Sequence, residues 1–99
     1  MNATPHIVII GGGHVGLRVA QALEQRTERT RAKIIERSRP VAERAADALE
    51  RTIVLNGDGM DMDLLMEASI DRADAVLAVT DDDKTNLLAA VRAKQAGCR

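Results

Sequence analysis

Three glycines near the start of the chain, and a glutamate further on, have the residue types and spacing to hold a sugar–diphosphate ligand. Gly11, Gly13 and Gly16 match the pattern G-x-G-x-x-G, and Glu36 follows the last glycine by 20 residues. In this pattern the first glycine permits a tight turn, the second lets a diphosphate approach the backbone, and the third lets a helix lie close on a sheet. A carboxylate at this offset accepts hydrogen bonds from both ribose hydroxyls and repels a 2′-phosphate. The spacing therefore predicts a site for NAD or NADH in preference to NADP.

The residues around the glycines fit the context that this pattern needs. An apolar run of strand length, 7–10, precedes the turn, and apolar residues at helical spacing follow it. Because a helix would begin at the turn, its free N–H groups and its dipole would point at the bound phosphates. His14 lies inside the turn, where its backbone N–H could serve a phosphate whatever its side chain does. The alternative is a strand–helix turn that keeps this shape and holds no ligand.

Other segments should reach the same edge, because ligands of open parallel sheets bind beyond the carboxyl ends of the strands. In the segment 56–59, Asn-Gly-Asp-Gly, the glycines would allow close backbone approach and Asp58 could hydrogen-bond the adenosine part. Asp58 could equally belong to a Gly-Asp turn that caps the following helix. Arg37 and Arg39, beside Glu36, could pack on the adenine or be solvated. If the ligand were NADP, these two arginines would be the natural partners of its 2′-phosphate.

A run of acids, Asp81 to Asp83, follows Thr80 at the start of the last helical pattern. Acids at a helix N-terminus interact favourably with the helix dipole, and Thr80 with Asp83 resembles a capping box. Consecutive side chains point in different directions, so three adjacent carboxylates do not favour a divalent cation site. The run is therefore expected to start a helix, and no metal site is predicted.

The order of apolar runs predicts an α/β fold. Runs rich in Val and Ile occupy 7–10, 33–36, 52–56 and 75–80, and their nearly continuous hydrophobicity is typical of strands covered on both faces. Helical patterns separate them; one starts after Pro40 and the last ends at Gly97. Right-handed crossovers then give a Rossmann-like, doubly wound parallel sheet with strand order 3-2-1-4. We expect 1–99 to be a single domain of a longer protein, truncated before or near a fifth strand, with an open edge that favours self-association.

Composition narrows the functions that such a fold could have. The chain contains no Phe, Tyr or Trp, so it offers no aromatic platform on which single-stranded nucleic acid could stack. Its formal net charge of −1 gives no electrostatic footprint for duplex nucleic acid. No apolar run approaches the ~20 residues of a transmembrane helix. The single Cys98 cannot form an internal disulfide, which is typical of a reducing cytosol. No Ser-His-Asp, Cys-His or metal-ligand spacing indicates an enzyme.

Longer motifs give the chain a resemblance to one family. They are I-I-G-G-G-H-V-G at 9–16, I-I-E-R at 34–37, V-L-N-G-D-G at 54–59, I-D-R-A-D-A at 70–75 and T-D-D-D-K-T-N at 80–86. Together they span nearly the whole chain, and the last three are more specific than the glycine turn. The chain resembles the nucleotide-binding RCK N-terminal (TrkA-N) domain of the regulatory subunits of bacterial Trk potassium-uptake systems.

The resemblance implies a non-catalytic, cytoplasmic ligand sensor that lies at the inner face of the membrane and regulates a potassium-conducting membrane transporter subunit. It implies NAD or NADH as the ligand, with ATP or ADP as alternatives at the same site, and assembly as homodimers or larger rings. Chains of this kind commonly contain two such domains. The competing interpretation is the cofactor-binding half of an NAD-dependent dehydrogenase, whose catalytic half would lie elsewhere in the protein.

The family's binding positions can be carried over to this sequence one by one. The phosphate-binding positions are Gly11, Gly13, His14, Val15 and Gly16. Glu36 becomes the ribose-binding acid, with Arg37 beside it. Asp58 would lie by the adenine, and Thr80 and Asp82 would lie near the nicotinamide half.

Overall fold

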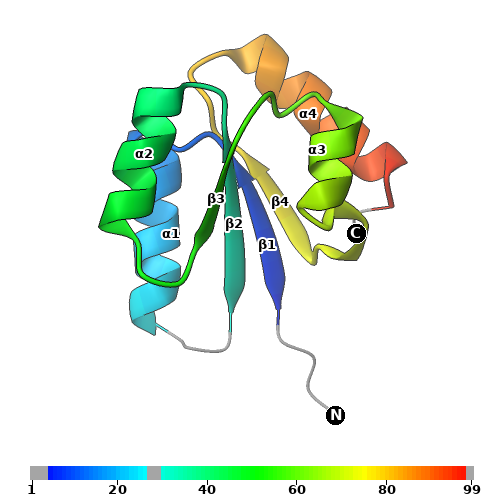
Figure 1. The fold of residues 1–99 in the computed structure, drawn as a ribbon. Helices are drawn as coiled ribbons and strands as arrows, with labels where there is room; N and C mark the ends of the chain where they lie inside the picture. The colour runs from blue at the N-terminus through cyan, green and yellow to red at the C-terminus, as the bar shows by residue number, and fades with distance from the viewer. Residues whose placement is uncertain (1–4, 27–29, 98–99) are drawn as a thin grey trace.

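The domain is built on a parallel sheet of four strands (Figure 1). The computed structural model describes residues 5–26 and 30–97, so Cys98 lies outside the described residues. The strands are β1 (His6–Ile10), β2 (Arg31–Glu36), β3 (Ile53–Asn56) and β4 (Ala75–Ala78). Their order is β3-β2-β1-β4 and every neighbouring pair is parallel. The predicted Rossmann-like arrangement, with strand order 3-2-1-4, is confirmed.

Helices cover both faces of this sheet (Figure 1). On one face lie α1 (His14–Arg26) and α2 (Arg39–Ala48); on the other lie α3 (Met62–Glu67), the short 3-10 helix η1 (Ile70–Arg72) and α4 (Asp83–Gln95). Alternate residues of the central strands point to opposite faces, as they must in a strand. One cluster therefore contains Ile9 of β1 and Ile34 of β2, and the other contains Ile10 of β1 and Ile35 of β2.

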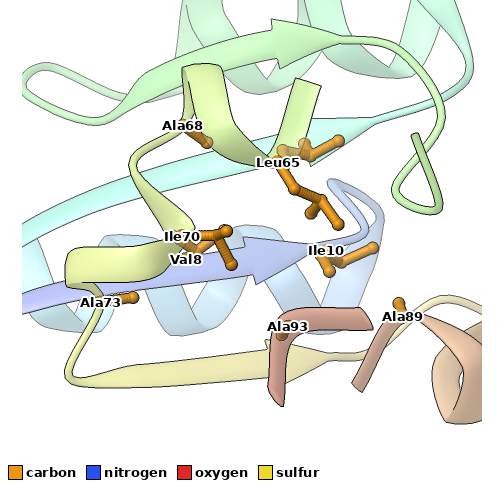
Figure 2. Close-up of a cluster of buried hydrophobic side chains, with 9 residues drawn as sticks. Val8, Ile10, Leu65, Ala68, Ile70, Ala73, Ala89 and Ala93 are labelled. Carbon is orange, nitrogen blue, oxygen red and sulfur yellow. The ribbon is translucent and has the colours of Figure 1, made fainter. Parts of the chain in front are cut away.

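The core is aliphatic and uses alanine where helices meet the sheet. Figure 2 shows Val8 and Ile10 of β1 beside Leu65 of α3 and Ile70 of η1, with alanines of the surrounding elements closing the cluster. Ala89 and Ala93, one turn apart in α4, are buried there. A methyl group lets the backbone of α4 approach the sheet closely, so the layer packs without aromatic side chains.

Only the central strands are covered on both faces. β1 and β2 contribute fully buried residues, but Ile53 of β3 is 52% exposed and Leu77 of β4 is 36% exposed. The prediction of full coverage is therefore wrong for the two outer strands. The reason is positional, since β3 and β4 form the sheet edges, where the helices leave part of each strand in solvent.

Strand boundaries differ from the predicted ones by up to two residues. Strand β2 begins at Arg31, two residues before its predicted start, and β4 ends at Ala78, two residues before its predicted end. Val79 donates one more backbone hydrogen bond, to the Ile10 carbonyl at 2.9 Å, and the chain then turns away into a loop. Helix α2 begins at Arg39, with Pro40 inside its first turn. Helix α4 ends at Gln95, and Gly97 has a φ of +104°, which fits the predicted glycine stop.

A single carboxylate fastens α1 to the turn that enters β3. Glu24, in the last part of α1, accepts hydrogen bonds from the N–H groups of Glu50 at 3.0 Å, Arg51 at 2.7 Å and Thr52 at 2.7 Å. The Thr52 hydroxyl donates a fourth, at 2.8 Å. Burial alone would raise the pKa of Glu24, but these hydrogen bonds outweigh it and lower the pKa from 4.5 to about 2. The folded protein therefore stabilises the charged form of Glu24.

Candidate functional site

A cavity of about 740 Å³ opens at the edge of the sheet where the strands end. This volume lies within the range of roughly 300–1,000 Å³ that is usual for small-molecule sites. The loops after all four strands contribute to its walls. Of the residues predicted to bind the ligand, all except Gly16 line it: Gly11, Gly13, His14, Val15, Glu36, Arg37, Asp58, Thr80 and Asp82.

Gly11 makes the turn out of β1 possible. Its φ of +114° lies in a region that side chains rarely tolerate. Its N–H donates to the Ile35 carbonyl at 2.8 Å, so the turn stays attached to β2. A Cβ at this position would lie 3.0 Å from the Thr80 nitrogen and 3.1 Å from the Val79 carbonyl carbon. The turn therefore rests directly on the backbone that leaves β4.

The other two glycines of the pattern have different surroundings. A Cβ on Gly16 would lie 1.8 Å from the Gly11 carbonyl oxygen, so this glycine lets α1 cross the turn closely, as predicted. Gly16 is buried and does not line the cavity. A Cβ on Gly13 would meet no atom within 4 Å, and this residue is exposed at the cavity wall. A ligand can thus approach the backbone at Gly13 without obstruction.

Helix α1 begins directly after Gly13, at the cavity. Its first backbone hydrogen bond joins the Leu17 N–H to the Gly13 carbonyl at 2.8 Å. The N–H groups of His14, Val15 and Gly16 come before that bond and have no acceptor one turn earlier in the helix. The first turn contains no acidic residue. These amides and the positive end of the helix dipole form a place where an anion is stabilised.

Glu36, the last residue of β2, is held firmly at the cavity wall. Its Oε1 accepts a hydrogen bond from the Gly12 N–H at 2.7 Å, and its Oε2 accepts one from the Ser38 N–H at 2.7 Å. The carboxylate therefore bridges the glycine turn and the start of α2. An ionised carboxylate has about four lone-pair positions, so each oxygen can still accept a further hydrogen bond. The group is oriented before any ligand arrives.

The two arginines beside Glu36 behave differently. Arg37 is exposed and lines the cavity. Arg39 lies outside it, in the first turn of α2, where its Nε lies 3.1 Å from Oε1 of Glu43. Both partners of that ion pair are mostly exposed, at 81% and 64%. Arg39 is therefore solvated, which was one of the two interpretations, whereas Arg37 lies where it could contact a ligand.

Asp58 lies at the cavity wall and closes a local turn. Its Oδ1 accepts from the Met60 N–H at 2.9 Å, and its carbonyl accepts from the Asp61 N–H at 3.0 Å. The helix cap is a different residue, because Asp61 is the N-cap of α3 and accepts from the Asp63 N–H at 3.0 Å. The interpretation that Asp58 caps that helix is therefore wrong.

The glycines on either side of Asp58 serve packing inside the protein. A Cβ on Gly57 would lie 2.4 Å from a methyl group of Leu64, and a Cβ on Gly59 would lie 2.4 Å from a methyl group of Ile10. We predicted that they allow close backbone approach. At both positions a side chain of the protein lies close to the glycine, and Gly59 also lines the cavity.

The acidic run after β4 starts a helix, but with a different cap from the predicted one. Asp82 is the N-cap of α4; its Oδ1 accepts from the Lys84 N–H at 3.1 Å and its Oδ2 from the Thr85 hydroxyl at 2.8 Å. The hydrogen bond from Thr85 is the main reason that the pKa of Asp82 lies below its usual value. The predicted capping box of Thr80 and Asp83 is wrong, because the Thr80 hydroxyl turns to Asn86 instead.

The sequence analysis did not predict the hydrogen bonds that two asparagines make to loops of the cavity wall. The side-chain N–H₂ of Asn56 donates to the Glu36 carbonyl at 2.9 Å and to the Arg37 carbonyl at 3.0 Å. The side chain of Asn86 forms hydrogen bonds to both backbone polar groups of Thr80. Each asparagine therefore ties down a loop that lines the cavity. Both lie within the quoted motifs, but the sequence shows no partner for an amide in a loop.

Metal binding finds no support in the described ranges. Among residues 5–26 and 30–97, no three His, Cys, Asp or Glu side chains come together in a way that could hold a metal ion. Over the same ranges, no helix has both the length and the hydrophobicity that crossing a membrane requires.

Comparison with known proteins gives the family. The model of the TrkA-N domain matches residues 7–98. The Trk system potassium uptake protein TrkA of Azorhizobium caulinodans is 42% identical over 93 residues, which cover 94% of this chain and 20% of that protein. The proteins of the same name from Vibrio alginolyticus and Haemophilus influenzae are 42% and 38% identical, over the same shares. The chain thus spans about a fifth of the length of these relatives. The chain belongs to the TrkA-N domain family, which occurs in Trk system potassium uptake proteins.

Proposed function

We propose that this domain binds NAD or NADH in the cavity at the carboxyl edge of the sheet. The observation that carries the proposal is the arrangement around Glu36. Its carboxylate is fixed by the N–H groups of Gly12 and Ser38, directly beside an open glycine turn and the start of a helix. A rigid acid next to free backbone amides is the arrangement that grips a ribose and the diphosphate attached to it.

The walls suggest the direction in which the dinucleotide lies. The adenosine ribose would lie on Glu36, with the adenine between Arg37 and Asp58. The diphosphate would cross the turn at Gly13 and the first amides of α1. The nicotinamide half would then extend toward Thr80 and Asp82, which line the cavity after β4, on the other side of β1 from Glu36. A 2′-phosphate would meet the negative charge of Glu36, so NADP should bind more weakly.

ATP and ADP are alternative ligands of the same cavity. Their ribose and phosphates could use Glu36 and the amides of the glycine turn. They contain no second nucleoside, so they would leave the wall formed by Thr80 and Asp82 largely unfilled. The cavity therefore supports the dinucleotide as the ligand that uses all of its walls.

We further propose that binding serves regulation rather than catalysis. The support comes from the relatives, each of which is named as a Trk system potassium uptake protein. In that role the domain would act as a ligand sensor on the cytoplasmic side of the membrane, in a dimer or larger ring that contacts a potassium-conducting transporter subunit. A ligand can shift such an assembly only by binding one of its states more tightly than another.

Isothermal titration with NADH and NADPH tests the binding proposal through Glu36. We expect wild-type protein to prefer NADH. Glu36→Gln should weaken NADH by ~2 kcal/mol, because hydrogen bonds to a charged group are lost, and it should narrow the preference over NADPH. Glu43→Gln, on the exposed face of α2, is the matched control and should change neither affinity. Unchanged NADH binding in Glu36→Gln would contradict the assignment of the ribose site.

A further inference from the structure

Asn86 sits one turn into α4 and reaches back to the loop that follows β4. Its side-chain Oδ1 accepts a hydrogen bond from the Thr80 N–H at 2.9 Å, and its Nδ2 donates to the Thr80 carbonyl at 2.9 Å. The Thr80 hydroxyl donates to the same Oδ1. The amide of Asn86 thus pairs with both backbone polar groups of one residue, Thr80, at the point where β4 has ended.

These contacts leave Thr80 little freedom to serve a ligand through its own polar groups. Its N–H donates to Asn86, and its hydroxyl has two acceptors within the protein, Oδ1 of Asn86 and, at 3.2 Å, the Asp82 carbonyl. The hydroxyl oxygen also accepts from the Asp82 N–H at 3.2 Å, which joins the loop to the cap of α4. Thr80 is therefore part of a fixed wall. The residue that fixes it, Asn86, is only half-buried and does not itself line the cavity.

We propose that Asn86 is a positioning residue that holds the cavity wall against which the second half of a dinucleotide lies. The inference rests on the proposed function, because it assumes that the ribose at Glu36 sets the direction of the ligand. Glu36 ends β2 and Thr80 follows β4, and these two strands lie on opposite sides of β1, so a ligand that stays on the β2 side would not need this wall. Asn86 should therefore affect the affinity for a dinucleotide but not the affinity for a mononucleotide bound at Glu36.

Asn56 offers a natural contrast at the other end of the cavity. Its side chain donates to the carbonyls of Glu36 and Arg37, so it holds the loop against which the adenosine part would lie. Every ligand that contains adenosine needs that end of the cavity. Loss of the Asn56 amide should weaken short and long ligands alike, whereas loss of the Asn86 amide should weaken only the long ones.

The test measures the dissociation constants of NADH and AMP by isothermal titration for the wild-type chain and for three variants. We expect Asn86→Ala to weaken NADH about tenfold, the effect of losing hydrogen bonds that shape the site, and to weaken AMP less than twofold. Asn56→Ala should weaken both ligands by similar factors. Gln95→Ala removes an exposed amide from the same helix and should change neither. Equal losses of NADH and AMP in Asn86→Ala, or no loss of NADH, would overturn the proposal.

A second variant covers the case in which Asn86→Ala fails to fold. Asn86→Asp keeps the acceptor for the Thr80 N–H but replaces the donor that faces the Thr80 carbonyl with an oxygen. It should weaken NADH several-fold and spare AMP; equal effects on the two ligands would again overturn the proposal. The proposed function fails separately, and this inference with it, if the wild-type chain binds neither ligand. If the wild-type chain binds NADH and both Asn86 variants bind it equally well, this inference fails and the proposed function stands.

Discussion

At the scale of single residues, the three glycines of the turn have separate physical reasons to be glycine. Gly11 needs a positive φ and space beside Thr80, Gly16 needs space beside the Gly11 carbonyl, and Gly13 needs neither. The first and third therefore serve the fold, whereas Gly13 is free of packing constraints and faces the cavity. The sequence pattern predicted this division, because each position in the pattern has a distinct mechanical role.

This division predicts opposite outcomes for two valine substitutions. Gly13→Val should change the free energy of unfolding by less than about 1 kcal/mol, since the new side chain meets open space, yet it should abolish measurable NADH binding. Gly16→Val should lower the free energy of unfolding by ~3 kcal/mol or more, because its Cβ collides with the backbone. Urea denaturation and titration of the same samples measure both effects. Tight NADH binding by Gly13→Val would show that the phosphates lie elsewhere.

The polar contacts made by side-chain amides could not be predicted from the sequence. Asn56 reaches the Glu36 carbonyl, 20 residues earlier in the chain, and Asn86 reaches the backbone of Thr80, six residues earlier. Which loop lies within hydrogen-bonding distance depends on the sheet order and on where each strand ends. The capping box was wrongly predicted for the same reason. Several residues near Thr80 in the sequence could accept its hydroxyl hydrogen, and the sequence does not show that Asn86 is the one that does.

Among the secondary structure elements, hydrophobic periodicity predicted the order of strands and helices but not which strands are exposed. Alternation of strands and helices was enough to give the sheet order, because the handedness of crossovers leaves few alternatives. Hydrophobic runs could not show which strands lie at the edges. Ile53 and Leu77 read as core residues, yet each lies on an outer strand that the helices cover only in part.

The hydrogen bonds that join Glu24 of α1 to the turn before β3 can be tested by substitution. Glu24→Gln should lower the free energy of unfolding by ~1–2 kcal/mol at neutral pH, because hydrogen bonds to a half-buried charge are weakened and solvent screens part of the effect. The folded pKa is about 2 and the unfolded value is 4.5, so this stabilisation is complete above pH 4.5 and is lost as the pH falls toward 2.

Urea denaturation of the wild-type chain and of Glu24→Gln across pH 2.5 to 7 measures this dependence. The difference between the two proteins should be constant near neutral pH and should shrink below about pH 4.5. Glu43→Gln is the control, since Glu43 holds only an exposed ion pair with Arg39. A difference that does not change with pH would show that the charge on Glu24 is not what stabilises the turn.

At the scale of the whole molecule, the fold gathers four loops from distant parts of the sequence around one cavity. The lining residues include Gly13 after β1, Glu36 at the end of β2, Asp58 after β3 and Thr80 after β4. Parallel strands make this possible, since all of their carboxyl ends lie at the same edge of the sheet. The relatives extend well beyond this domain, because the matched segment covers only 20% of each of them.

A crystal structure of the domain soaked or grown with NADH would show whether the dinucleotide lies along these walls. We expect the adenosine ribose hydroxyls on the Glu36 carboxylate, the diphosphate over Gly13 at the start of α1, and the nicotinamide half beside Thr80. This arrangement would be contradicted by a dinucleotide bound away from Glu36, or by an empty cavity at saturating NADH.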